Sequence, residues 1–161
     1  MNTKMTPRYG WAGRSERCPG KAPHGHWNTS TFIGALRYDG LQAPWLIDGP
    51  INGDGFIAYL EHVLTPTLKL GDIVICDNLS SHKVAREQEI VEQAGASLIY
   101  LPPYSPDLNP IENAFSKLKS CICRASARTF EQLLQALDQA IDKLTKQDCS
   151  AYFKHAKYRT I

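Results

Sequence analysis

The chain has 161 residues, of which 43% are hydrophobic and 21% charged, the composition of one ordinary globular domain. This composition excludes collagen, a long coiled coil and a wholly disordered chain. Apolar runs are only a few residues long, whereas a membrane-spanning helix needs about 18, and no apolar segment follows Met1 as in a signal peptide. We expect a single cytoplasmic domain over residues 1–161, without membrane contact.

The five cysteines are an odd number without the spacing of a disulfide framework, which favours reduced thiols. Cys121 and Cys123 form a lone C-x-C pair, and Cys18 with His24 and His26 lacks a fourth ligand. A zinc site at either place is therefore the alternative to ordinary solvated side chains.

The net charge of +2 conceals a three-part pattern. Residues 1–38 hold six basic residues and one acidic residue, residues 39–112 hold three basic and eleven acidic residues, and residues 113–161 hold nine basic and four acidic residues. An acidic middle between basic ends is either a set of solvated charges or a metal-binding centre flanked by surfaces for a polyanion. The charge pattern alone does not choose between them.

The first predicted elements are two strands, over residues 31–38 and 42–47. Both runs are rich in β-forming residues, and Asp39-Gly40 between them is a strong turn dipeptide. Together they predict an antiparallel hairpin.

A helix is predicted next, over residues 56–64, where apolar residues recur at helical spacing and Asp54 is a plausible N-cap. Residues 53–58 also match the G-x-G-x-x-A pattern of a dinucleotide-binding turn. The charge of Asp54 would repel a pyrophosphate, and the preceding strands are expected to be antiparallel. We therefore favour a turn and a capped helix, with a nucleotide-cofactor enzyme as the alternative.

Two continuous apolar runs, residues 73–76 and 97–101, predict buried strands. A polar helix over residues 81–93, closed by Gly95, is predicted between them. Residues 102–110 contain four prolines and predict a stiff loop.

Two helices are predicted after this loop. An apolar stripe at helical spacing covers residues 111–122, and a stronger one covers residues 130–144. Thr129 with Gln132 is a capping-box signature at the start of the second helix. The order strand, strand, helix, strand, helix, strand, helix, helix predicts a layered α/β domain.

Asp77 and Glu112 are the candidate catalytic residues. Asp77 directly follows the apolar run 73–76, and functional groups of α/β sheets gather outside the carboxyl ends of strands; the alternative is that it merely opens a turn. Glu112 lies in the first turn of its predicted helix, at the edge of the buried face. It either closes a capping box with Asn109 or points toward the end of the sheet.

The residues around both acids form two long motifs. They are C-D-N-L-S-S-H-K at residues 76–83 and P-P-Y-S-P-D-L-N-P-I-E at residues 102–112, with 34 residues between Asp77 and Glu112. On these motifs the chain resembles the bacterial insertion-sequence transposases of the mariner superfamily, which are DDE endonucleases. The resemblance also includes Y-G-W-A at residues 9–12 and D-G-P-I-N-G at residues 48–53.

The resemblance implies an α/β domain of RNase H-like fold, a mixed sheet flanked by helices, that cleaves DNA at insertion-sequence ends and transfers the strands. It implies two Mg²⁺ or Mn²⁺ ions, with Asp77 bridging both ions and Glu112 holding one. Several basic residues are candidate contacts to DNA phosphates, each with a solvated surface charge as its alternative. They are Arg8, Arg14, Arg17, His82, Lys117, Lys119 and Arg124.

One part of the family pattern has no counterpart here. The family's first acid lies in a D-E-[ST] segment upstream of the matching residues, so we expect the first catalytic strand and the helix-turn-helix region to be missing. We then expect an isolated chain that is inactive, and a partner that is either a second copy or an upstream-encoded transposase half. The alternative function is a non-catalytic nucleic-acid-binding or regulatory fragment of a transposase.

Overall fold

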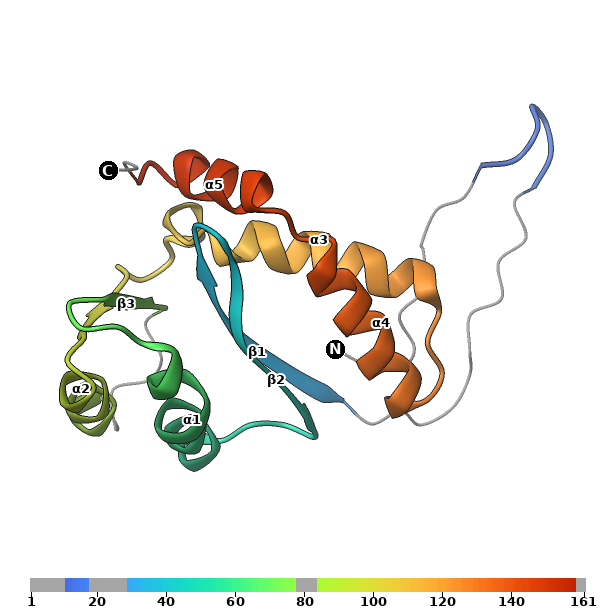
Figure 1. Cartoon of the computed structure of the whole chain (residues 1–161). Coiled ribbons are helices and arrows are strands. Elements are labelled where there is room, and N and C mark those ends of the chain that lie inside the picture. The colour runs from blue at the N-terminus through green and yellow to red at the C-terminus, as the bar shows by residue number, and fades with distance from the viewer. Residues whose placement is uncertain (1–10, 18–28, 78–83, 159–161) are drawn as a thin grey trace.

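The computed structural model describes residues 11–17, 29–77 and 84–158, which form an α/β arrangement (Figure 1). Strands β1 (Ser30–Arg37) and β2 (Gly40–Asp48) form one two-stranded sheet, and β3 (Ile73–Cys76) and β4 (Ser97–Tyr100) form another. The described residues therefore hold two small sheets where one mixed sheet was expected. No ladder among them joins the first pair of strands to the second.

The hairpin of β1 and β2 is antiparallel, as predicted, and both of its faces are covered. Phe32 pairs with Leu46, and the next pair is Ile33 with Trp45. Because successive side chains of a strand point to opposite sides, these two pairs lie on opposite faces. The hairpin is thus a middle layer between two groups of helices.

Helices α3 (Ile111–Ala125) and α4 (Phe130–Asp142) cover the face that carries Phe32 and Leu46. The cluster between them includes Leu118, which is fully buried. Both helices were predicted from their apolar stripes, and each helix packs the face that carries its stripe against the hairpin.

The opposite face packs against α1 (Gly53–Tyr59) and the π-helical turn that continues it (Leu60–Leu64). Asn52 caps α1, since its side-chain oxygen accepts from the N–H of Gly55 at 2.8 Å. The expectation that Asp54 is the N-cap is therefore wrong.

Gly55, in the first turn of α1, packs closely against Ile51. A Cβ added to Gly55 would lie 2.9 Å from Cγ1 of Ile51, so a larger residue there would force the Ile51 side chain to shift. The preceding hairpin is antiparallel and not part of a parallel βαβ unit. Both features argue against the dinucleotide-binding alternative.

Strands β3 and β4 are parallel, and α2 (Val84–Gln93) packs beside them. Gly95 follows α2 with a φ of +77°, as expected for a helix-closing glycine. The side chains of Ile73, Ile75 and Ile99 are 61%, 36% and 49% exposed. The prediction of two buried strands is therefore wrong, because the described residues leave the face with these isoleucines uncovered.

Capping boxes begin the two C-terminal helices. Thr129 and Gln132 cap α4, as predicted. Thr145 and Asp148 cap α5 (Lys146–His155), a helix that the apolar pattern did not predict. No helix in the described part is both long and apolar enough to cross a membrane.

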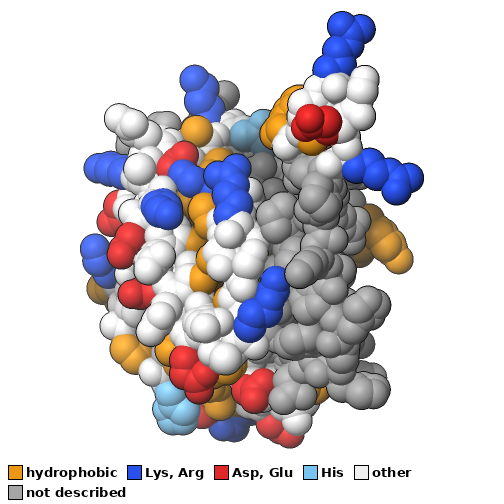
Figure 2. Space-filling model, turned by 90° about the vertical axis from the view of Figure 1, so that its right-hand side faces the viewer, with side chains coloured by type: hydrophobic (Ala, Val, Ile, Leu, Met, Phe, Trp, Pro, Cys, Tyr) orange, Lys and Arg blue, Asp and Glu red, His pale blue; other side chains and the backbone are white. Residues whose placement is uncertain are grey.

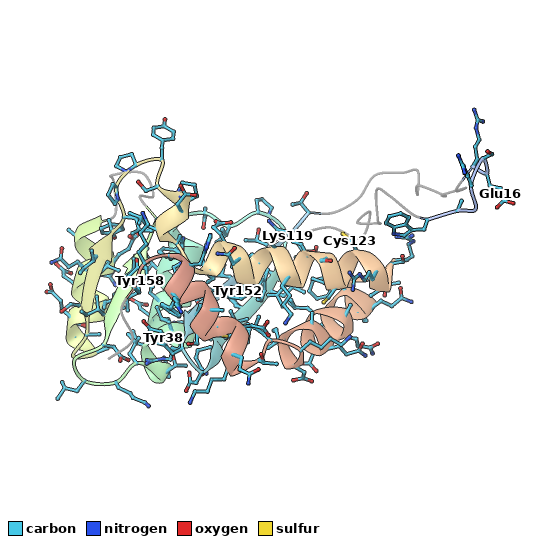
Figure 3. The ribbon with its side chains drawn as sticks, turned by 90° about the horizontal axis from the view of Figure 1, so that it is seen from above. Glu16, Tyr38, Lys119, Cys123, Tyr152 and Tyr158 are labelled. Carbon is cyan, nitrogen blue, oxygen red and sulfur yellow. The ribbon has the colours of Figure 1, made fainter. Side chains whose placement is uncertain are left out.

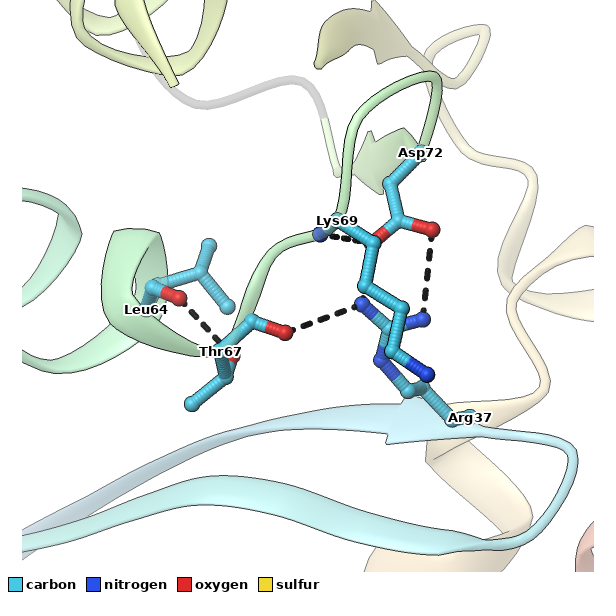
Figure 4. Close-up of polar contacts among 5 residues, drawn as sticks. All are labelled: Arg37, Leu64, Thr67, Lys69 and Asp72. Carbon is cyan, nitrogen blue, oxygen red and sulfur yellow. Dashed lines mark hydrogen bonds and ion pairs between the residues drawn. The ribbon is translucent and has the colours of Figure 1, made fainter. Parts of the chain in front are cut away.

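Arg37, at the end of β1, ties the hairpin to the segment before β3 (Figure 4). Its guanidinium donates to both carboxylate oxygens of Asp72 and, at 3.2 Å, to the carbonyl oxygen of Thr67. Asp72 also accepts from the backbone N–H of Lys69 at 2.7 Å. The hydrogen bond between Arg37 and Asp72 is the main cause of a lowered pKa of Asp72 and a raised pKa of Arg37.

We expect Asp72→Asn to lower the free energy of unfolding by about 1 kcal/mol at neutral pH, because the pair is partly exposed. Since the pKa of Asp72 is lowered by folding, its contribution is complete above the unfolded pKa of about 3.9 and is lost as the pH falls through the folded pKa. Thermal unfolding of both proteins from pH 7 to pH 2 should show a difference that shrinks only in acid.

Glu61→Gln is the matched control for this experiment. Glu61 pairs with Arg86 at 3.1 Å, and the two side chains are 33% and 65% exposed, so we expect almost no effect on stability. Equal destabilisation by both substitutions, or a loss for Asp72→Asn that does not change with pH, would contradict this role of Arg37 and Asp72.

Candidate catalytic site

Asp77 lies directly after β3, and its side chain is exposed. Its Oδ1 accepts a hydrogen bond from Nδ2 of Asn109 at 3.1 Å. Asn109 stands at the end of the proline loop, 32 residues further along the chain. This bond brings the two sequence motifs together.

Backbone hydrogen bonds fix the loop that carries Asn109. The N–H of Leu101 donates to the carbonyl of Cys76 at 2.8 Å, which continues the β3–β4 ladder to the start of the loop. A 3₁₀ turn over Pro106–Leu108 follows, and the N–H of Asn109 closes it by donating to Pro106 at 2.9 Å. Because prolines fix φ along the same stretch, the loop has few alternative conformations.

Glu112 lies in the first turn of α3, three residues after Asn109. Its N–H donates to the Asn109 carbonyl at 3.3 Å, and the N–H of Ile111 donates to the Asn109 side-chain oxygen at 3.3 Å. Asn109 gives its own N–H to Pro106, and the N-cap is Pro110. The alternative of a capping box between Asn109 and Glu112 therefore does not form. Within the described ranges, no residue bonds the exposed Glu112 carboxylate.

Tyr158, which Figure 3 labels, follows α5 and contacts this loop. The hydroxyl of Tyr158 donates to the carbonyl oxygen of Leu108 at 2.9 Å. The Tyr158 ring meets Phe153 of α5 edge-on at 5.8 Å, and Phe153 stacks on Tyr38, between β1 and β2, at 4.1 Å. The hairpin, α5 and the proline loop are therefore linked by one chain of contacts.

A buried carboxylate and a thiol lie near the end of β3. The hydroxyl of Tyr100 donates to Oε2 of Glu87 at 2.5 Å, and Glu87 is only 6% exposed. Burial first, and then the charges of Glu87 and Asp77, raise the pKa of Cys76 to about 12. The Cys76 thiol therefore stays protonated at neutral pH and is a poor metal ligand and nucleophile.

Asp77 and Glu112 offer hard carboxylate oxygens, the ligand type that Mg²⁺ and Mn²⁺ prefer. Among the described residues, no three His, Cys, Asp or Glu side chains stand close enough together to hold a metal ion. The donor chemistry of the two acids thus fits a divalent ion, but the described residues supply only part of a ligand set. The same finding gives no support to zinc at Cys121 and Cys123, which are half-buried thiols on α3.

The candidate DNA contacts have different surroundings. Lys117 donates from Nζ to Oδ2 of Asp148 at 2.6 Å, a bond that raises the pKa of Lys117.

On the face that Figure 2 shows, basic side chains are spread out, with acidic ones among them. The candidates with exposed side chains are Arg14, Arg17, Lys119 and Arg124. Outside the described residues lie Arg8, His82, Cys18, His24 and His26.

The described part is an α/β protein in which Asn109 links the segments that carry Asp77 and Glu112. A family model described as DDE superfamily endonuclease matches residues 1–134. The chain therefore belongs to the DDE superfamily endonucleases and is related to transposases. A search among curated proteins found no match.

Two contributors to the site were missed in the sequence. Asn109 was considered only as a helix cap. Its position near the end of the proline loop, three residues before Glu112, was a signal of a wider role. Tyr158 lies beyond the matched residues and 50 residues from its partner Leu108, and no local pattern indicates such a contact.

We expect Tyr158→Phe to loosen the proline loop, because it removes the hydrogen bond to Leu108 at a cost of about 1 kcal/mol. Hydrogen exchange at the amides of Asn109, Ile111 and Glu112 should become faster. Tyr152→Phe is the control, since it removes a hydroxyl from nearby α5, in the cluster around Cys149. Unchanged exchange in Tyr158→Phe, or equal acceleration in both variants, would show that Tyr158 does not hold the loop.

Proposed function

We propose that the chain is the catalytic domain of a DNA transposase, which cleaves DNA at insertion-sequence ends and joins the strands to a target. The observation that carries this proposal is the hydrogen bond between Asn109 and Asp77. It joins the end of β3 to the first turn of α3, the turn that contains Glu112. Membership of the DDE endonucleases supports the same reaction class.

In this proposal, Asp77 and Glu112 hold Mg²⁺ or Mn²⁺. Asn109 occupies Oδ1 of Asp77, which orients the carboxylate and leaves Oδ2 for a metal ion. Glu112 presents its carboxylate from a helix whose first turn Asn109 fixes through Ile111. Two bound ions would activate water or a DNA 3′-hydroxyl and stabilise the leaving oxygen.

We further propose that the third carboxylate comes from a strand outside the described residues, belonging to another chain or to an upstream-encoded half. Within the described part, β1 is paired only with β2, and β3 only with β4. Arg37 keeps the end of β1 close to the start of β3. A strand between their open edges would join the two pairs into the mixed sheet of an RNase H-like fold.

A plasmid-nicking assay tests this proposal. We expect the isolated chain with Mg²⁺ or Mn²⁺ to leave supercoiled DNA intact, since a two-ion site needs more than two carboxylates. Fusion of a β-strand ending in Asp-Glu-Thr before Asn2 should give nicking that EDTA abolishes. In the fusion, Asp77→Asn and Glu112→Gln should each abolish nicking.

Asp107→Asn in the same fusion is the matched control, because Asp107 is an exposed acid of the same proline loop. It should keep nicking activity near that of the unsubstituted fusion. Metal-dependent nicking by the unfused chain that disappears in Asp77→Asn would refute the external third acid. Nicking by the fusion that survives Asp77→Asn would refute the proposed site.

We propose that exposed bases of α3 contact DNA phosphates without reading sequence. Affinity should fall steeply with salt from a dissociation constant of about 10⁻⁴–10⁻⁶ M at physiological salt. Lys119→Ala and Arg124→Ala should each reduce the slope of log K against log salt by about 1. Lys117→Met should leave the slope unchanged, because its ammonium is paired with Asp148.

Fluorescence anisotropy with two unrelated duplexes at several salt concentrations measures these slopes. Tight binding to one sequence that does not depend on salt would contradict the phosphate contacts. If the salt slope changes for Lys117→Met and not for Lys119→Ala, the proposed DNA contact by the exposed bases of α3 is wrong.

The second candidate function is a non-catalytic subunit that binds nucleic acid or regulates a full-length transposase. The uncovered apolar face of β3 and β4, with Ile73, Ile75 and Ile99, favours this candidate, because exposed apolar surface marks contact sites. The nicking assay distinguishes the two, since a non-catalytic subunit stays inactive after fusion.

A further inference from the structure

Tyr104 is an aromatic residue that the fold does not bury. Its side chain is fully exposed, at 102% of the reference area. Its backbone φ is +57°, the left-handed region that is costly for a bulky residue and that glycine adopts freely. A core or packing role does not explain an exposed ring on a strained backbone, and such strain gathers at functional sites.

Tyr104 borders the same cavity as the candidate catalytic acid. A cavity of about 370 Å³ is lined by Asp77, Pro102, Pro103, Tyr104, Ser105 and Pro106. Three prolines and Ser105 line it together with Tyr104 and Asp77, and its size is in the range of small-molecule sites. Tyr104 and Asp77 therefore face the same space.

The loop that presents Tyr104 is fixed at its far end. Tyr158 holds the carbonyl of Leu108, and Asn109 is bonded to Asp77. Ser105 also donates from its hydroxyl to the carbonyl of Pro103 at 3.3 Å. A ring on so constrained a loop loses little conformational freedom when it binds a flat partner.

We propose that Tyr104 stacks on a nucleobase whose face is open, at an unpaired position or a strand end, next to the phosphate that Asp77 serves. This inference rests on the proposed DNA transposase function. Stacking on an aromatic ring accepts any base, since every base has a π-face, and it needs an exposed ring beside the path of the strand. Tyr104 then places the strand relative to Asp77 and acts as a positioning residue for DNA.

The test compares two DNA probes that bind the full chain. One probe is a fully paired duplex, and the other is the same duplex with one unpaired base. Wild type should bind the second probe more tightly, by on the order of tenfold. Tyr104→Ala should lose this preference and keep its affinity for the paired duplex, whereas Tyr104→Trp should retain the preference.

Tyr104→Gly separates a binding role from a structural one. Glycine adopts the left-handed backbone without strain, so the thermal midpoint should stay the same or rise while the preference for the unpaired base is lost. A lower midpoint for both Tyr104→Gly and Tyr104→Ala would mean that the ring supports the fold, and would overturn the proposal.

The other possible results of the binding test would each overturn the proposal. Wild-type binding of both probes with equal affinity would overturn the stacking role and leave DNA binding intact. A preference for the unpaired base that survives Tyr104→Ala would overturn it as well, and so would an equal loss of affinity for both probes in that variant. A chain that binds neither probe would refute the proposed DNA function, and this inference with it.

Discussion

The hydrogen bond from Asn109 to Asp77 is the contact on which the candidate site depends. One amide side chain donates to the acid after β3 and accepts from the N–H of Ile111, while its backbone carbonyl accepts from Glu112. The two acids come from segments that are not neighbours in sequence, so only a contact of this kind fixes one relative to the other. The prolines before it limit how far the loop can depart from this arrangement.

The layered fold supplies the support for that contact. Helices cover both faces of the β1–β2 hairpin, so its position is set by burial of apolar side chains on two sides. From this layer, Tyr38 reaches α5 through Phe153, and Tyr158 then holds the proline loop at Leu108. The C-terminal segment lies beyond the part that matches the DDE endonuclease family, yet it contributes to the geometry around the family's motif.

Local signals in the sequence predicted the hairpin, the capping box of α4 and the closing glycine of α2, because each depends on residues close together in the chain. The apolar content of β3 and β4 was mistaken for burial, since the pattern does not report whether another element covers a face. Asp77 and Glu112 were singled out from their positions after an apolar run and in the first turn of a predicted helix. The resemblance added their metal-binding roles, which stay predictions. The long-range contacts of Asn109 and Tyr158 follow from the packing of distant segments, and no local pattern specifies their partners.

The central claim is that Asp77 and Glu112 bind the same divalent ion. Titration of the ¹⁵N-labelled full chain with Mn²⁺ tests it directly, because paramagnetic broadening reports which amides lie near the bound ion. We expect the amides at Asp77 and Glu112 to broaden first and together, and Asp77→Asn to remove both effects. Broadening at only one of the two acids, or first at other residues, would contradict it.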